Sequence, residues 1–243
     1  MNADVLAVTT VAAVVVLSGA AAARSYWRRA VRWAESMRGM RTRIWDVAAL
    51  MRLFPDGYVP PGINDWTASP DLLAEIARQV RRRRPSRLLE LGSGVSTLIT
   101  ASVLMRNDHG RLYSLDHDAD YARATAVELE QAGLLTFAEV RHAPLAKSSA
   151  YPSAWYDESV LADIDALDLV IVDGPPTDLD PKARAPALTM LWPCLSIGGL
   201  MIFDDANRTG DRQVIQAWAA QCPTAKVTWL PLEKGCALIE KLA

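Results

Sequence analysis

Apolar residues follow two spacings along most of the chain, in short continuous runs and in repeats of three or four positions. Short apolar runs are typical of buried strands, whereas the wider repeat is typical of helices that bury one face. The runs predict strands at residues 87–91, 111–116, 137–141, 167–173, 200–204, 227–230 and 236–239. The repeats predict helices at residues 71–83, 96–106, 121–132, 181–191 and 211–220. This alternation of strands and helices predicts an α/β fold with a doubly wound, Rossmann-like sheet.

The N-terminus contains a longer apolar run. Residues 5–23 carry no charge, and nineteen residues are enough for a helix that crosses a bilayer. Arginine and aromatic residues follow the run, which is typical of the cytoplasmic end of a membrane span. We therefore expect a single-pass transmembrane anchor at residues 1–23, with the catalytic domain on the cytoplasmic side. A cleaved signal peptide is one alternative, because the alanines at residues 20–23 could form a cleavage site, and a soluble or packed helix is another.

Residues 24–69 connect this anchor to the sheet domain. Their first part has apolar residues at helical spacing with arginines between them, which predicts a basic amphipathic helix. Their second part is rich in proline and glycine and contains Trp66, a candidate lid over a binding site. The sequence thus predicts three parts: an anchor at residues 1–23, a basic helix with a lid or linker at 24–69, and the sheet domain at 70–243.

Composition narrows the class of protein. The net charge of −2 provides no general attraction toward nucleic acid, and we expect no nucleic-acid partner. Cys194, Cys222 and Cys236 are far apart and lack the paired spacing of a zinc site or a disulfide framework.

A glycine-rich turn follows the predicted strand at residues 87–91. Glycines allow the backbone to turn sharply and to approach a ligand closely. The turn comprises Gly92, Ser93 and Gly94, and it is preceded by the acidic residue Glu90. A glycine turn at the carboxyl end of a strand is where open α/β sheets bind nucleotides.

The residues after this turn indicate which nucleotide it suits. A dinucleotide fingerprint would have a third glycine, but Thr97 occupies that position. We expect Ser96 or Thr97 to cap the following helix. The next predicted strand ends at Asp116, whose carboxylate can accept hydrogen bonds from ribose hydroxyls.

The turn and the strand-terminal acid together resemble the class I S-adenosylmethionine-dependent methyltransferases. The resemblance implies a seven-stranded sheet with an antiparallel strand at its end, and S-adenosylmethionine as the cofactor. It implies that the turn lies against the methionine part of the cofactor and that Asp116 binds the ribose. The implied cofactor-binding residues are Glu90, Gly92, Ser93, Gly94, Asp116 and Asp173.

Three carboxylates follow the predicted strands at residues 167–173 and 200–204. If these strands are neighbours, Asp173, Asp204 and Asp205 meet at one edge of the sheet. Clustered carboxylates need a compensating cation or proton, and Mg²⁺ prefers oxygen ligands. The pattern resembles metal-dependent O-methyltransferases of the catechol and macrolide-sugar type, which implies that these three residues bind Mg²⁺. Alternatively, Asp173 contacts the cofactor or substrate, and the other two acids cap the next turn.

The catalytic base is less clearly indicated. Catechol-type enzymes carry a lysine three residues after the first acid, where this chain has Pro176. Asp173, Asp204 or His142 would then act as the base, although a lone histidine is also common as an ordinary surface or core residue. Trp155 and Tyr156 lie in an insertion before residue 167, where they either stack on an acceptor ring or pack the loop onto the sheet.

These features together predict a membrane-anchored methyltransferase. Its acceptor would be a hydroxyl on a small molecule, a sugar or a lipid-linked glycan, and Mg²⁺ would assist the reaction. Two alternatives stay open, namely a nicotinamide-dependent Rossmann oxidoreductase and a non-catalytic membrane-anchored binding module. The sequence leaves open whether the chain forms a homodimer.

Overall fold

The computed structural model describes residues 27, 44–60, 67–147, 153–164, 166–177 and 180–243. The chain divides into two compact units, Met1–Trp45 and Asp46–Ala243. The predicted anchor at residues 1–23 and the candidate lid Trp66 lie outside the described residues. Within the described part of the chain, no helix has both the length and the apolar character to cross a membrane.

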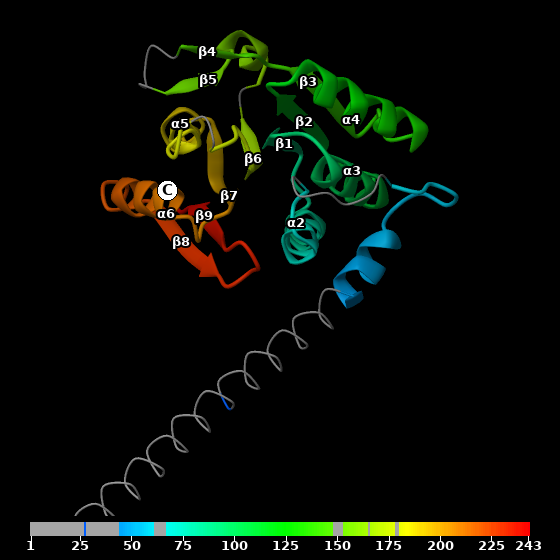
Figure 1. Ribbon diagram of the computed structural model, residues 1–243, viewed down its shortest axis with the longest axis horizontal. Coiled ribbons are helices and arrows are strands. Elements are labelled where there is room, and N and C mark those ends of the chain that lie inside the picture. Colours follow the sequence, from blue (N-terminus) through cyan, green and yellow to red (C-terminus); the bar gives the residue numbers. More distant parts are fainter. Residues whose placement is uncertain (1–26, 28–43, 61–66, 148–152, 165, 178–179) are drawn as a thin grey trace, which may run out of the picture. The chain divides into compact units, whose positions relative to one another are not determined.

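A seven-stranded sheet forms the centre of the larger unit (Figure 1). The strands are β1 (Arg87–Leu91), β2 (Arg111–Asp116), β3 (Ala138–His142), β6 (Leu167–Val172), β7 (Leu195–Asp204), β8 (Ala225–Leu230) and β9 (Cys236–Lys241). Their order across the sheet is β3-β2-β1-β6-β7-β9-β8. The first five run parallel, and β9 pairs antiparallel with both β7 and β8. The predicted doubly wound sheet and its antiparallel end are therefore confirmed.

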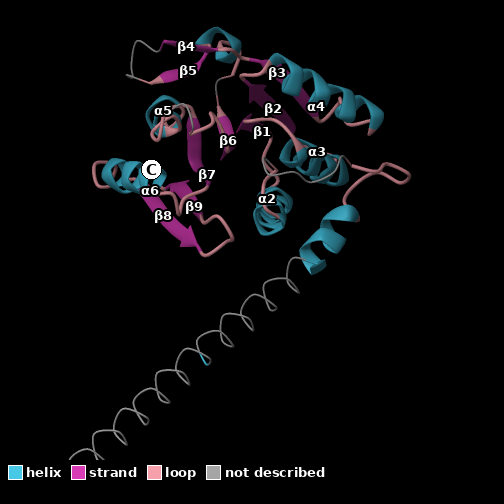
Figure 2. Cartoon of the chain, in the orientation of Figure 1, coloured by secondary structure: helices cyan, strands magenta, loops and turns pink. Residues whose placement is uncertain are grey.

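Helices cover both faces of this sheet (Figure 2). One face packs on α2 (Pro70–Arg83), α3 (Val95–Asn107) and α4 (Ala119–Gln131). The other packs on α5 (Ala185–Met190) and α6 (Thr209–Ala219). Alternation along each strand divides the apolar side chains between the two cores, so that Leu88 joins the first and Leu89 the second.

An insertion between β3 and β6 was not predicted as regular structure. It contains a short antiparallel pair, β4 (Leu145–Lys147) with β5 (Ala154–Tyr156), and a 3-10 turn, η1 (Glu158–Leu161). Trp155 and Tyr156 are almost completely buried and belong to the second core. Of the two roles considered for this pair, packing of the insertion onto the sheet is therefore observed.

The largest differences in extent between predicted and observed elements concern one helix and one strand. The helix predicted at residues 181–191 is only α5, because Pro186 lacks an N–H and suits the first turn of a helix better than its interior. The strand predicted at 200–204 is twice as long, since β7 continues back to Leu195 through an irregularity opposite Leu167 and Leu169. Gly198 has φ +78° there, and the glycine pair at residues 198–199 therefore bends the strand without ending it.

Candidate active site

The glycine turn joins β1 to α3 at the carboxyl edge of the sheet. Gly92 adopts φ +94°, and its N–H donates to the carbonyl of Leu115 on the neighbouring strand. A Cβ on Gly92 would lie 3.3 Å from the backbone of Asp173 and of Gly174. Only glycine fits this position comfortably, because the turn and the loop after β6 are in backbone contact.

The Thr97 side chain caps the helix after the turn. Gly94 is the N-cap residue of α3, and Thr97 is the third residue of the helix. The Thr97 hydroxyl accepts from the Gly94 N–H at 2.9 Å and donates to the Glu90 carboxylate at 2.5 Å. The prediction that Ser96 or Thr97 caps the helix is therefore confirmed for Thr97, which also ties the turn to β1.

Glu90 lies beneath the turn and is completely buried. Its Oε2 accepts hydrogen bonds from the hydroxyls of Thr97 and Ser114, and its Oε1 has no partner among the described residues. Burial raises the pKa of Glu90 to about 7, although these hydrogen bonds favour the charged form. Glu90 is absent from the lining of the adjacent cavity, so in this structure it supports the turn from below.

Asp116 ends β2 beside the turn. Its Oδ2 accepts from both the backbone N–H and the hydroxyl of Ser93, at 3.0 and 2.6 Å. Its Oδ1 accepts from the Asp118 N–H at 3.0 Å and lies 3.5 Å from the ring of His117. Asp116 is thus held in a fixed position at the edge of the sheet, and its predicted role in binding the ribose stays a prediction.

A cavity of about 630 Å³ opens above this edge. Pockets of roughly 300 to 1,000 Å³ accommodate cofactors and drug-sized ligands. The lining brings together residues from the turn, the ends of β2 and β6, and the segments before α5 and α6. Of the predicted site residues, Gly92, Ser93, Asp116, Asp173 and Asp205 line it.

The three predicted metal ligands lie together. Carboxylate oxygens of Asp173, Asp204 and Asp205 all lie within 4.8 Å of one another. This closeness follows from the parallel pairing of β6 with β7, which brings the carboxyl ends of both strands to the same edge. Burial and mutual repulsion raise the pKa values of Asp173 and Asp204 above the usual range, and Arg184 opposes both shifts.

A buried arginine compensates much of this negative charge. Arg184 immediately precedes α5, and its guanidinium lies 2.9 Å from Asp205 Oδ2 and 3.2 Å from Asp173 Oδ1. The same guanidinium donates to the backbone carbonyl oxygens of Asp173, Pro175 and Asp204. Arg208 adds a second positive charge 3.1 Å from Asp205 Oδ2.

The sequence interpretation missed Arg184. It took the clustered acids to require a metal ion or a proton, whereas the fold supplies a cation of its own. The sequence feature that could have indicated its role is its position between Ala183 and Ala185, where a charged residue starts an otherwise apolar segment.

His142 is separate from this group. It is exposed at the end of β3, paired in register with Asp116, and it does not line the cavity. Its predicted role as a base stays a prediction. Within the described part of the chain, Tyr156, Thr177 and Lys234 line the cavity without having been predicted as site residues.

The site suits both groups that the sequence suggested. For a nucleoside cofactor, Asp116 offers a fixed carboxylate beside an exposed glycine backbone within a cavity of suitable volume. For a divalent cation, the oxygens of Asp173, Asp204 and Asp205 are hard ligands at compatible spacing. Arg184 engages only one oxygen each of Asp173 and Asp205, which leaves the second oxygen of each carboxylate for such an ion.

Comparisons with known proteins agree with this fold. Residues 89–206 match a family model described as a methyltransferase domain. The search of curated proteins found no match to this sequence.

Solved structures resemble the chain at low sequence identity. The S-adenosylhomocysteine-bound methyltransferase PaMTH1 from Podospora anserina has a TM-score of 0.57 at 17% identity, over 83% of this chain and 88% of its own. A methyltransferase from Geobacter sulfurreducens has a TM-score of 0.54 at 16% identity, over 82% of this chain and 88% of its own. The O-methyltransferase TomG from Streptomyces achromogenes, solved with S-adenosylmethionine, has a TM-score of 0.53 at 16% identity, over 73% of this chain and 82% of its own.

At these identities the solved structures show a shared fold, while the family match lies on the residues that form the turn and the acid cluster. Residues 89–206 thus match a methyltransferase-domain model, and the chain shares its fold with solved S-adenosylmethionine-dependent methyltransferases.

Proposed function

We propose that this chain binds S-adenosylmethionine and transfers its methyl group to a hydroxyl oxygen of an acceptor. The observation that carries the proposal is Asp116, fixed at the end of β2 beside the glycine turn, facing a cavity that also reaches the acid cluster. Several of the solved relatives were crystallised with this cofactor or its product. Asp116 would accept from the ribose hydroxyls, and the turn would contact the methionine part.

We also propose that Mg²⁺ assists the transfer, held by Asp173, Asp204 and Asp205. When bound, such an ion would coordinate the acceptor hydroxyl and lower its pKa. Asp173 and Asp205 line the cavity, so they are placed to orient an acceptor near the cofactor. Arg184 would keep the carboxylates in place whether or not the ion is bound, because it also bonds to three backbone carbonyls.

The nicotinamide-dependent alternative is not favoured. A dinucleotide fingerprint has glycine where this chain has Thr97, and the Thr97 side chain here bonds to both Glu90 and Gly94. The site therefore uses a threonine hydroxyl where the fingerprint requires the absence of a side chain.

The acceptor and the location of the protein remain proposals from the sequence. We propose a small-molecule, sugar or lipid-linked acceptor, and a single-pass anchor at residues 1–23 that keeps the domain on the cytoplasmic side of a membrane. An anchor of this kind would bring the cavity to acceptors held at the membrane surface.

Calorimetric titration of the full chain in detergent tests the cofactor part of this proposal. We expect S-adenosylmethionine and S-adenosylhomocysteine to bind with micromolar affinity, and NADH not to bind. Incubation with S-adenosylmethionine and a panel of hydroxylated acceptors would then identify the methylated product by mass spectrometry. Failure of a folded chain to bind S-adenosylmethionine would refute the proposal.

A further inference from the structure

The side chain of Tyr156 presents a buried hydroxyl that has no hydrogen-bond partner among the described residues. The residue is only 1% exposed, and it lines the cavity above the glycine turn. Among the described residues with an unpartnered buried side-chain atom, Tyr156 alone also lines this cavity. Leaving a buried hydroxyl unpaired is unfavourable, so a ligand that pairs with it would recover that free energy.

The hydroxyl lies at the boundary between β1 and β6. Tyr156 Oη is so close to Gly174 that a Cβ on this glycine would collide with it, and the same Cβ would lie 3.2 Å from the Gly92 backbone nitrogen. Asp116 lies at the end of β2, on the other side of β1. The hydroxyl therefore lies between the glycine turn and the loop after β6, where the methionine part of the cofactor would lie under the proposed function.

The insertion that carries Tyr156 is anchored on both sides. Tyr156 pairs with Leu145 in the two-stranded sheet, and its ring packs edge-to-face on Trp155 with centroids 5.3 Å apart. The next residue, Asp157, donates its N–H to the carbonyl of Pro144. The hydroxyl is therefore held at the cavity wall by its neighbours.

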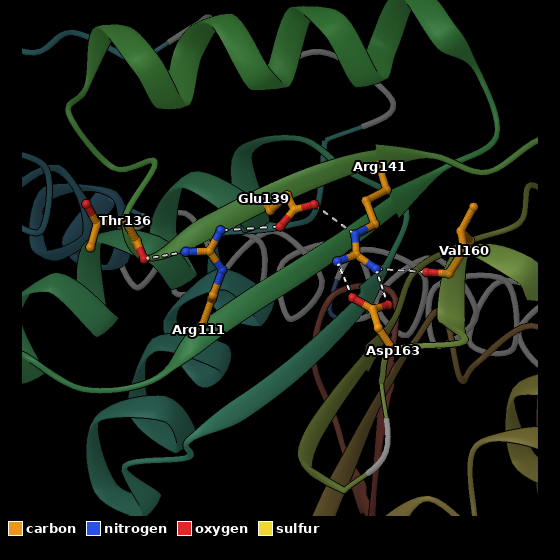
Figure 3. A network of polar contacts seen from close by, with 6 residues as sticks. All are labelled: Arg111, Thr136, Glu139, Arg141, Val160 and Asp163. Carbon is orange, nitrogen blue, oxygen red and sulfur yellow. Dashed lines mark hydrogen bonds and ion pairs between the residues drawn. The ribbon is translucent and has the colours of Figure 1, made fainter.

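A polar network at the edge of the main sheet fixes the far end of the insertion (Figure 3). Arg141 on β3 forms two parallel hydrogen bonds with Asp163, at 2.6 and 2.9 Å, and also donates to the carbonyl of Val160. Glu139 accepts from Arg141 and from Arg111, which extends the network across two strands. This network restrains the segment that follows Tyr156, so the unpaired hydroxyl cannot readily turn away to find another partner.

The charges and hydrogen-bonding groups around the Tyr156 hydroxyl determine which ligand atom it would bind. Burial, followed by the nearby charge of Asp116, raises the pKa of Tyr156 well above its usual range, so the group stays a neutral O–H donor. Asp173 is an acceptor on the same side of the cavity and suits an ammonium group. Beyond its ribose, S-adenosylmethionine carries an ammonium, a sulfonium and a carboxylate, and only the carboxylate accepts hydrogen bonds strongly.

We infer that Tyr156 is a cofactor-binding residue whose hydroxyl donates a hydrogen bond to the amino-acid carboxylate of S-adenosylmethionine. The inference rests on the proposed function and assigns a new residue to the same site. Tyr156 would thereby help to fix the methionine part of the cofactor, and hence the direction in which the methyl group is presented.

The test compares Tyr156→Phe with the wild type by calorimetry, using two ligands. S-Adenosylhomocysteine carries the carboxylate, whereas 5′-methylthioadenosine has the same nucleoside and sulfur but lacks the amino acid. We expect the variant to bind S-adenosylhomocysteine at least about tenfold more weakly, the effect of one lost hydrogen bond to a charged group, and to bind 5′-methylthioadenosine as the wild type does. Tyr113→Phe is the matched control, because Tyr113 is outside the cavity lining and should leave both affinities unchanged.

The melting temperature of the ligand-free protein provides a second measurement. Since the hydroxyl has no partner there, we expect Tyr156→Phe to melt at the wild-type temperature or above. Unchanged affinity for S-adenosylhomocysteine, an equal loss for both ligands, or a variant that no longer folds would each overturn the inference. If the wild type itself bound neither ligand, the proposed function would fail first, and this inference would fail with it.

Discussion

The guanidinium Nη1 of Arg184 lies 2.9 Å from Oδ2 of Asp205, and both side chains are about 95% buried. The same arginine contacts Asp173, so one cation stabilises two carboxylates at the ends of adjacent strands. A buried ion pair adds little net stability over apolar packing, but removal of one partner leaves a buried charge uncompensated.

Arg184→Met should therefore lower the free energy of unfolding by about 3 to 5 kcal/mol. Urea denaturation followed by circular dichroism measures this change. The second substitution Asp205→Asn in the same chain should recover part of the loss, because it removes one of the uncompensated charges. Arg123→Met is the control, since the pair of Arg123 with Asp120 is exposed and should contribute little. An Arg184→Met chain as stable as the wild type would show that the cluster does not depend on this cation.

Glu90 should make the stability of the fold depend on pH. The pKa of Glu90 is about 7 in the folded chain and about 4.3 in an unfolded one, so the folded state holds the proton more tightly. The protonated carboxyl stabilises the fold fully at a pH below the pKa of Glu90 in the unfolded chain. This stabilisation is lost as the pH rises through the pKa of Glu90 in the folded chain.

Between about pH 4 and pH 8, the free energy of unfolding of the wild type should fall by about 3 kcal/mol relative to Glu90→Gln. Urea titrations across this range measure the difference, and the exposed Glu130→Gln should follow the wild type. Parallel curves for the wild type and Glu90→Gln would mean that the buried carboxyl does not titrate in this range.

Asp116 should contribute strongly to cofactor affinity. A hydrogen bond to a charged group contributes about 1.5 to 3 kcal/mol, so Asp116→Asn should weaken S-adenosylhomocysteine binding by about 10- to 100-fold. Isothermal titration calorimetry gives the dissociation constant. Asp120→Asn is the matched control, because that carboxylate is 87% exposed on the following helix and lies outside the cavity lining. Equal affinities for the two variants would remove Asp116 from the site.

Removal of divalent cations should abolish methyl transfer and leave cofactor binding largely intact, because Asp116 and the glycine turn would bind the cofactor without the ion and only Asp173 is assigned to both groups. A chelator titration of the methyltransferase reaction measures the first effect, and calorimetry with S-adenosylhomocysteine measures the second. Direct titration of the protein with Mg²⁺ should give a binding signal that Asp205→Asn loses. Full activity in the presence of the chelator would exclude a required metal.

Sequence reasoning predicted the strand ends well. The continuous apolar runs before Glu90, Asp173 and Asp204 left little choice of where buried strands lie, and parallel pairing then brings their carboxyl ends together. The glycine turn was equally readable, because the conformation of Gly92 excludes most other residues.

The sequence could not predict contacts that depend on tertiary structure. Arg184 reaches residues on two different strands, and no local pattern around it indicates those partners. The pairing of β4 with β5 is too short to have a clear alternation, and the burial of Tyr156 depends on the sheet beneath it. Side-chain spacing alone suggested a metal ion or a proton as compensation for the acids, since the arginine that balances them is brought in by the fold.

Because Gly92 has no side chain, the glycine turn lies directly against the backbone that follows β6. Because the turn touches the backbone of Asp173 and Gly174, the part that would hold the cofactor and the part that carries the acids form one block, set by the spacing of two paired strands. Neither can shift without the other. Adaptation to new acceptors would therefore fall to the loop after Gly174, where length and composition can change while the donor geometry stays constant.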